Sequence, residues 1–362
     1  MSKKRSSDVD TRGKLAKDVQ RIDRELVKLM NERAKVVKQL ARAPIGESAE
    51  LNSVATDIDA AISSGRGPLD ERALRATFRE LASGCRALSK PIRVAYLGPL
   101  YSYSYLATIE RFGSSAELAP VATIAAVFEE LNRGHADYGV VPLENSTDGR
   151  VVDTLGMFAR MPVRICGEVQ LRIHHNLLAK CERGDITEVY SKPQALSQCR
   201  EWLAKHLPTA RTVEMTSTAA AAQLAAEKPG AAAVASRLAA TNYGLDFVAE
   251  NIEDNPHNVT RFAVIGGEVG QRTGKDKTAV MFEIPHQPGS LADVMAIFKR
   301  EKLNMTWIES FPMAGGNSEY LFFIELEGHQ TDAKVGRALG LLGKKTVRLE
   351  ILGSYSTAEP ID

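Results

Sequence analysis

The sequence has few cysteines, almost no net charge and no long apolar run. Its 362 residues include four cysteines, and none of them forms a CxxC pair. This spacing argues against a disulfide framework or a zinc site and favours reduced thiols. The formal net charge is +1, with both signs mixed along the chain. Because no sustained basic face is present, we expect no nucleic-acid partner.

No hydrophobic segment is long enough to cross a membrane. A spanning helix needs roughly 20 apolar residues, and no run approaches that length. The basic start Lys3-Lys4-Arg5 is not followed by the apolar stretch of a secretion signal. We therefore expect a cytoplasmic protein without a membrane partner, and the length predicts two or three domains.

Residues 1–90 are predicted to form an all-α domain. Apolar side chains recur at steps of three and four over residues 15–40, which places them on one stripe of a long helix. A second helix is expected over residues 51–62 and a third from Pro68 to Leu88. The stripe needs a partner helix, so we expect a homodimer or homotetramer.

Residues 91–268 change to short β-type runs that alternate with helical stretches. This alternation is typical of an α/β sheet covered by helices. The segment has room for two lobes with a cleft between them, as in periplasmic binding proteins. A polar linker at residues 266–276 follows. Residues 277–356 then show the order strand, helix, strand, strand, helix, strand, which predicts a ferredoxin-like α+β domain.

Four motifs stand out in the middle segment of the chain. Residues 139–149 read GVVPLENSTDG, and residues 251–262 read NIEDNPHNVTRF. Between them lie residues 167–178 and 190–199, which also look like family segments. The chain thus resembles a prephenate dehydratase over nearly all of residues 92–266. A single motif could be chance, but four in register are hard to explain otherwise.

The resemblance implies the decarboxylating dehydration of prephenate to phenylpyruvate in phenylalanine biosynthesis. Hydroxide is a poor leaving group, so it needs a hydrogen-bond donor placed against it. The resemblance assigns this role to the hydroxyl of Thr260, acting through geometry and electrostatic preorganisation. No metal or organic cofactor is implied.

The resemblance also implies a set of substrate-binding side chains. Most are uncharged, which avoids stabilising the departing carboxylate too strongly. Arg261 is expected either to pair with a substrate carboxylate or to act as a structural tie. Adjacent His174 and His175 would point to opposite faces of a strand, so we leave them out of the catalytic set and expect one of them in a buried hydrogen-bonding role. The substrate set is Asn145, Ser146, Ser191, Gln198, Ser102, Ser104, Glu144 and Arg261.

Each of these residues also has an ordinary structural interpretation. Asn145 and Ser146 suit a turn or a helix cap, and Ser191 suits a cap before the next helix. Glu144 is a candidate for organising its loop rather than for acid or base work. The functional interpretation depends on the joint occurrence of the four motifs.

One loop departs from the family pattern. Residues 98–105 read GPLYSYSY, where prephenate dehydratases usually have Gly-Pro-x-Gly-Thr-Phe/Tyr-Ser-His. Tyr101 replaces a glycine, which we expect to remove access to positive φ and to add a bulky ring near the cleft. Arogenate, the aminated relative of prephenate, therefore stays open as a substrate.

The N-terminal region resembles the helical chorismate mutases that are fused to many dehydratases. Arg33 matches one of the cations that clamp the substrate carboxylates. The family's earlier arginine falls at Ala16 and its lysine at Pro44, and residues 51–62 contain no basic residue. Because the clamp is incomplete, we expect a mutase-like scaffold. A bifunctional mutase–dehydratase is the disfavoured alternative.

Residues 277–356 resemble an ACT regulatory domain. In dehydratases the two matching segments, 288–292 and 303–312, meet across a subunit interface and bind phenylalanine. Backbone N–H groups at a helix N-terminus suit an amino-acid carboxylate. Phe311 stands where the family has an arginine, which leaves the identity of the effector and the sign of its effect open. The implied effector residues are Gly289, Ser290, Leu291, Ala292, Asn304, Glu309 and Ser310.

The rival hypothesis from another class is a two-lobed protein that binds an aromatic acid without catalysis. Thr260 together with Asn145, Ser191 and Gln198 favours the enzyme, because a mere binder needs no donor at a leaving group.

Overall fold

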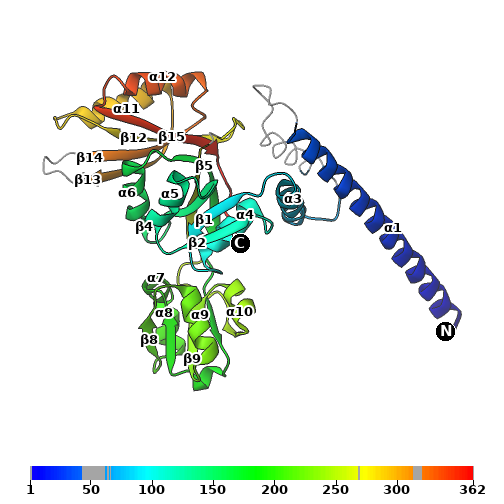
Figure 1. Cartoon of the computed structure of the whole chain (residues 1–362). Helices are drawn as coiled ribbons and strands as arrows, with labels where there is room; N and C mark the ends of the chain where they lie inside the picture. The colour runs from blue at the N-terminus through cyan, green and yellow to red at the C-terminus, as the bar shows by residue number, and fades with distance from the viewer. Residues whose placement is uncertain are drawn as a thin grey trace. The chain divides into compact units, whose positions relative to one another are not determined.

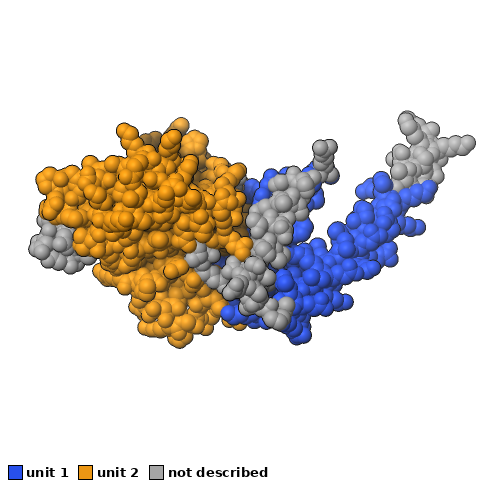
Figure 2. All heavy atoms as spheres, turned by 90° about the horizontal axis from the view of Figure 1, so that it is seen from above, with its two compact units in different colours: residues 1–92, 112–116 blue, residues 93–111, 117–362 orange. Residues whose placement is uncertain are grey.

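The fold is described by a computed structural model, which covers residues 2–42, 62, 65, 67–267, 270–312 and 320–361. Two compact units are present, one made of residues 1–92 and 112–116 and the other of residues 93–111 and 117–362 (Figure 2). The helix expected over residues 51–62 lies outside the described residues except for Ile62. The turn expected at residues 314–317 also lies outside them.

The first unit is helical where it is described. It contains α1 (Ser2–Leu40) and α3 (Glu71–Ala87) (Figure 1). The predicted helix start at Pro68 is wrong, because the carboxylate of Asp70 accepts a hydrogen bond from the Ala73 amide at 2.7 Å and caps the helix there. The apolar stripe of α1 is open to solvent over Leu15, Val19, Ile22, Leu26 and Leu29, which are 45% to 60% exposed.

The second unit begins with a six-stranded sheet of order β2-β1-β3-β11-β5, in which β4 pairs with β3. Strand β11 runs antiparallel to both of its neighbours, β3 and β5. The strands of this first lobe are β1 (Arg93–Leu97), β2 (Glu117–Val121), β3 (Tyr138–Asn145), β4 (Gly149–Arg150), β5 (Arg164–Arg172) and β11 (Val259–Gly266). Its helices are α4 (Tyr103–Phe112), α5 (Ile124–Asn132) and α6 (Val152–Arg160).

A second lobe is built on a five-stranded sheet of order β10-β6-β9-β7-β8. Residues 193–207 do not form one continuous helix, because Cys199 leaves helical geometry at φ −116° and ψ 15°. The strands are β6 (Asn176–Ala179), β7 (Glu188–Ser191), β8 (Arg211–Glu214), β9 (Ala231–Ala235) and β10 (Asp246–Ala249). The helices are α7 (Pro193–Gln198), α8 (Arg200–His206), α9 (Thr218–Glu227) and α10 (Arg237–Tyr243), and a 3-10 turn covers Arg183–Asp185. The chain crosses between the lobes after β5 and returns before β11, so the predicted two-lobed α/β fold is confirmed.

The C-terminal part forms a four-stranded antiparallel sheet of order β13-β14-β12-β15. The order of strands and helices agrees with the ferredoxin-like pattern expected from the sequence. The elements are β12 (Asp276–Glu283), α11 (Ser290–Glu301), β13 (Met305–Pro312), β14 (Tyr320–Glu327), α12 (Ala333–Leu342) and β15 (Arg348–Ser356).

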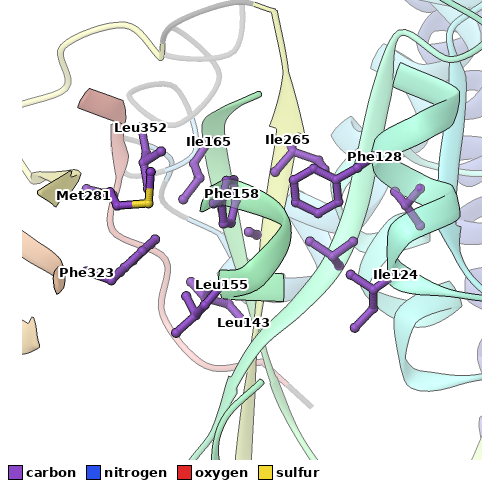
Figure 3. Packing of buried hydrophobic residues seen from close by; sticks show 14 of the residues in the cluster. Ile124, Phe128, Leu143, Leu155, Phe158, Ile165, Ile265, Met281, Phe323 and Leu352 are labelled. Atoms are coloured by element: carbon purple, nitrogen blue, oxygen red, sulfur yellow. The ribbon is translucent and has the colours of Figure 1, made fainter. Parts of the chain in front are cut away.

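Both faces of the two central strands of this sheet, β12 and β14, are buried. Alternate residues point to opposite sides, so Val280 and Phe282 pack with α11 and α12 while Met281 packs toward the first lobe. Phe323 and Leu352 share the side of Met281 and lie close to Phe158 of α6 (Figure 3). One hydrophobic core therefore joins the C-terminal sheet to the first lobe.

None of the helices in the described part of the chain combines the length and the apolar character that crossing a lipid bilayer requires.

We predict that truncation of Phe158 destabilises the core that the first lobe and the C-terminal sheet share. The ring is fully buried, with its centroid 5.1 Å from that of Phe128 and 6.0 Å from that of Phe323. Phe158→Ala should lower the free energy of unfolding by about 3–5 kcal/mol in urea titrations, because it leaves a cavity. Val152→Ala on the exposed side of the same helix should change it by less than about 0.5 kcal/mol. Equal effects of the two substitutions would contradict a shared core.

Candidate active site

Thr260 and Asn145 lie opposite each other on β11 and β3. The side-chain amide of Asn145 donates a hydrogen bond to Oγ1 of Thr260 at 2.8 Å and another to Oδ1 of Asn258 at 2.8 Å. Asn258 precedes Thr260 by two residues, and strand alternation places both side chains on one face. This face carries uncharged hydrogen-bonding groups.

A line of hydrogen bonds continues from Asn258 into the second lobe. Its Nδ2 donates to Oε1 of Gln198 at 2.9 Å. The same Gln198 oxygen lies 2.9 Å from Nε2 of His175, and Nε2 of Gln198 donates to Asp148 at 2.9 Å. The line therefore connects Thr260, Asn145 and Gln198, which the sequence predicted to act together, and it reaches across both lobes.

The turn after β3 is organised by the side chain of Asn145. Its Oδ1 accepts hydrogen bonds from the amides of Thr147 at 2.9 Å and Asp148 at 3.0 Å. These two donors fix the orientation of the amide, so that its nitrogen points to Thr260. Ser146 accepts a hydrogen bond from the Val259 amide at 2.9 Å and joins the turn to the start of β11.

His175 is a buried, uncharged member of this group. His175 is 2% exposed, and burial lowers the pKa of its imidazole. Because Gln198 presents an oxygen to it, Nε2 carries the proton in the neutral ring. The expectation of one buried hydrogen-bonding histidine is confirmed. Its neighbour His174 lies 2.8 Å from Glu253 through Nδ1.

Three predicted serines hold local structure. Ser191 is fully buried and donates to the carbonyl of Val234 at 2.6 Å. Ser102 accepts from the Tyr105 amide at 3.3 Å, and the carbonyl of buried Ser104 accepts from the Thr108 hydroxyl at 2.7 Å. Ser191 does not cap the next helix, because Lys192 holds that position without a side-chain hydrogen bond. None of these contacts extends to the Thr260 line.

Arg261 and Glu144 point to the opposite side of the sheet from Thr260. Arg261 donates to Glu144 at 2.8 Å, to Glu168 at 3.0 Å and to Glu325 of the C-terminal sheet at 2.6 Å. Burial acts to lower the pKa of the guanidinium, but the charges of Glu325 and Glu168 outweigh it and raise this pKa. Arg261 and Glu144 therefore leave the substrate set, and the alternative of a structural tie is the one that these contacts support.

Tyr101 adopts the backbone conformation that its side chain was expected to prevent. Its φ is 65°. The ring packs edge-on against two others: its centroid lies 5.5 Å from that of Tyr105 and 5.8 Å from that of Tyr243 in the second lobe. The expectation that tyrosine excludes positive φ here is therefore wrong, and aromatic packing across the lobes accompanies the unfavourable backbone.

The predicted effector residues fall into two groups. The loop of Gly289, at φ 88°, lines a hollow of about 320 Å³ together with Ser290, Leu291, Ala292 and Phe322. Ser310 is the register partner of Phe322 on the neighbouring strand.

The second group makes contacts outside this hollow. Asn304 donates to Glu327 at 2.9 Å, and the carboxylate of Glu309 pairs with Arg150 of β4.

Sequence reasoning missed Asn258, Asp148 and His175 as members of the hydrogen-bonded line. Asn258 carried a usable signal, because it lies two residues from Thr260 on an extended segment. Asp148 and His175 stand inside the quoted motifs, but only the folded chain brings them to Gln198.

Comparisons with known proteins show the family of the chain. A sequence profile of the family described as prephenate dehydratase matches residues 94–269. The bifunctional chorismate mutase/prephenate dehydratase of Aquifex aeolicus is 40% identical over 354 residues, which cover 95% of this chain and 97% of that protein. The prephenate dehydratase of Lactococcus lactis is 38% identical and is covered over 98% of its length by 73% of this chain.

A solved structure shows similarity to the same family. The prephenate dehydratase of Arthrobacter aurescens, in complex with L-Phe, superposes with a TM-score of 0.69 at 35% identity. The alignment covers 74% of this chain and 90% of that one. The fold and the site thus define a two-lobed α/β enzyme of the carbon–oxygen lyase class. The chain belongs to the prephenate dehydratase family.

We predict that His175 makes the protein less stable in acid. Its pKa in the folded state lies below the usual 6.5, so below that pH the unfolded chain binds a proton that the folded chain does not. Stability is complete above the unfolded pKa and falls as the pH drops toward the folded pKa. His175→Gln keeps a donor for Gln198 without titrating.

Urea titrations at about pH 7.5 and 5.5 measure this effect. The wild type should lose up to about 1 kcal/mol more stability than His175→Gln over that interval. Identical losses would show that His175 does not contribute.

Proposed function

We propose that the chain converts prephenate into phenylpyruvate, carbon dioxide and water, with the Thr260 hydroxyl as the donor to the leaving oxygen. The family and its lyase activity follow from the comparisons. The role of Thr260 is supported by one observation above all, the hydrogen bond from Asn145 to Oγ1 of Thr260.

That hydrogen bond directs the Thr260 proton. Because the Asn145 amide donates to Oγ1, the oxygen acts there as an acceptor and its own O–H remains available for another group. A donor to Oγ1 also withdraws electron density from the O–H bond and makes it a better hydrogen-bond donor. The hydroxyl is therefore held ready for the substrate.

The reaction uses this donor at the ring oxygen. The electron pair of the bond to the departing carboxylate enters the ring, carbon dioxide leaves, and the ring C–O bond breaks with its own electron pair. Thr260 stabilises the charge that develops on the leaving oxygen and passes a proton to it, so that it departs as water, and a proton from solvent restores the Thr260 hydroxyl. Aromatisation of the ring supplies the driving force. Uncharged groups around Thr260 do not hold the carboxylate back.

We predict that the hydroxyl, and not the shape of Thr260, carries the catalysis. Thr260→Ala should lower kcat by about 10²–10³-fold, as removal of one transition-state donor does. Thr260→Ser keeps the hydroxyl and should retain a large part of the wild-type kcat. Phenylpyruvate formation from prephenate, followed by ultraviolet absorbance, measures both.

The matched control is Thr212→Ala, an exposed strand threonine in the second lobe. It should retain wild-type kcat. The assignment of Thr260 fails if Thr260→Ala keeps wild-type kcat, and parallel reactions with arogenate test the alternative substrate.

We further infer that residues 277–356 act as an ACT sensor for phenylalanine, with Gly289, Ser290, Leu291, Ala292, Asn304, Glu309 and Ser310 as its binding residues. The related Arthrobacter protein was solved with L-Phe bound. The hollow at Gly289 supports the proposal because φ 88° at this position suits glycine and opens the loop before α11. The domain boundaries at 1–90, 91–268 and 277–356 belong to the same proposal.

The first unit is proposed to be a mutase-like scaffold for a homodimer or homotetramer. The exposed stripe on α1 supports helix-to-helix association, since apolar side chains at this spacing are normally covered. Arg33 donates to Sγ of Cys85 at 3.4 Å.

Chorismate mutase activity is a second candidate function, because the similarity to the bifunctional Aquifex protein covers 95% of this chain. We predict that the wild type does not convert chorismate, because the carboxylate clamp is incomplete. Chorismate consumption measured beside prephenate consumption decides the question. Turnover that Arg33→Ala abolishes would establish the mutase and contradict the scaffold.

A further inference from the structure

Tyr101 has a backbone conformation that is costly for a tyrosine. Its φ of 65° lies in the left-handed region, which an aromatic residue rarely adopts. Two other non-glycine residues in the described part of the chain have a positive φ, and both have a local reason. Asparagine, as at Asn251, tolerates this region, and Lys302 is the C-cap of α11. A costly conformation persists where surrounding contacts hold it, and for Tyr101 these are the contacts of its ring.

The Tyr101 ring belongs to a row of four tyrosines that runs from the first lobe into the second. Ring centroids lie 5.9 Å apart for Tyr96 and Tyr105, 5.5 Å for Tyr105 and Tyr101, and 5.8 Å for Tyr101 and Tyr243. The two contacts of Tyr101 are edge-on, which is a favoured geometry for aromatic rings. Tyr96 belongs to β1, Tyr105 to α4 and Tyr243 to α10 of the second lobe. Within this tyrosine row, Tyr101 therefore makes the contact that joins the lobes.

A second unfavourable feature lies in the same row. The hydroxyl of Tyr96 is buried and has no hydrogen-bond partner within the described ranges. A buried polar group without a partner costs free energy, as a left-handed tyrosine does. Natural proteins concentrate such violations of local rules at functional sites. Their coincidence in one row of contacting rings points to a role beyond packing.

The row reaches the edge of the sheet at which Thr260 lies. Strands β1 and β3 are parallel neighbours, so the loop of Tyr101 after β1 and the turn after Asn145 lie at one edge. Thr260 pairs with Asn145 near the start of the antiparallel strand β11, which is the same edge. Because neighbouring strands are about 4.8 Å apart, β1 and β11, on either side of β3, are separated by roughly 10 Å. Tyr101 therefore joins the lobes beside the proposed catalytic centre.

The lobes have a polar contact at this edge as well. Nε2 of Gln198 in the second lobe donates to Asp148 in the turn between β3 and β4. Each group hydrogen-bonds to water when the lobes part, so the net gain of this contact on closure is small. The rings of Tyr101 and Tyr243 bury apolar surface when they meet, which favours closure even without substrate.

Short connections permit the lobes to open and close. The chain crosses between them at residues 173–175 and 250–258. A few residues outside regular elements are sufficient to absorb the backbone changes of a hinge. The balance between open and closed arrangements then depends on the contacts that form when the lobes meet.

We propose that Tyr101 and Tyr243 form a clasp that holds the lobes together before the substrate binds, which makes Tyr101 a positioning residue of the dehydratase. When a fraction of the molecules has the arrangement that binds substrate, the apparent affinity is reduced by that fraction. The clasp raises this fraction and thereby lowers KM for prephenate. The chemical step is left to Thr260, whose hydrogen bond from Asn145 involves no member of the row. The kinetic part of this inference rests on the proposed conversion of prephenate.

Tyr101→Gly tests the clasp, because glycine adopts a positive φ without cost and carries no ring. We expect KM to rise about two- to tenfold, the range that one aromatic pair contributes, while kcat changes less than about twofold. Tyr243→Ala should raise KM by a similar factor. The double variant should show no further rise, because both substitutions remove the same contact. Tyr101→Phe keeps the ring and should retain the wild-type KM.

Hydrogen–deuterium exchange of the substrate-free proteins gives a measurement that does not depend on activity. The backbone amides of α10 should exchange faster in Tyr101→Gly than in the wild type, because the clasp no longer holds this helix against the first lobe. The matched control is Leu100→Gly, which places a glycine at an exposed position of the same loop. It should leave KM and the exchange of α10 unchanged. Circular dichroism verifies that each variant folds.

The outcomes separate the clasp from the function on which it rests. A wild type that forms no phenylpyruvate removes the proposed function, and the exchange of α10 then decides the clasp alone. Wild-type KM and exchange in Tyr101→Gly overturn the clasp. A rise in KM for Tyr101→Gly but not for Tyr243→Ala also overturns it, because Tyr101 then acts on the substrate directly. An equal rise in Leu100→Gly assigns the effect to loop flexibility and overturns the clasp as well.

Discussion

The structure of the second unit depends on one buried cation. Arg261 donates to Glu144 of β3, Glu168 of β5 and Glu325 of β14, so it joins both neighbours of its own strand to the C-terminal sheet. Lys277 adds a second cation at 3.2 Å from Glu168, and the pKa of that buried carboxyl is lowered by the two positive charges against the effect of burial. Without Arg261, buried carboxylates would lose their main partner, which is strongly destabilising.

Strand β11 separates two kinds of chemistry by its alternation. Thr260 contacts the uncharged side chain of Asn145, whereas Arg261, the next residue, faces carboxylates. The charges that stabilise the fold are thereby kept on the side away from the proposed substrate, whose own charges must rearrange during the reaction. Fixing Arg261 also fixes the direction of Thr260, because a strand cannot turn one of these side chains without the other.

The sequence was sufficient for residues that stand in the recognised motifs. Thr260 and Asn145 stand in motifs at the ends of long strands, and the structure brings them into contact. Arg261 remained ambiguous because its partner Glu325, 64 residues further along the chain, stands outside those motifs. The backbone of Tyr101 was also misjudged, because its ring contacts come from a different lobe.

The two-sided burial of β12 and β14 limits how the C-terminal domain can move. A hinge that swung it away from the first lobe would bring Met281, Phe323 and Leu352 into water, at about 1.5–3 kcal/mol for each side chain. A small ligand cannot readily supply that amount in addition to its own binding. Coupling across this boundary must therefore act through an exchange of side-chain partners at the rim, while the domain itself stays in place.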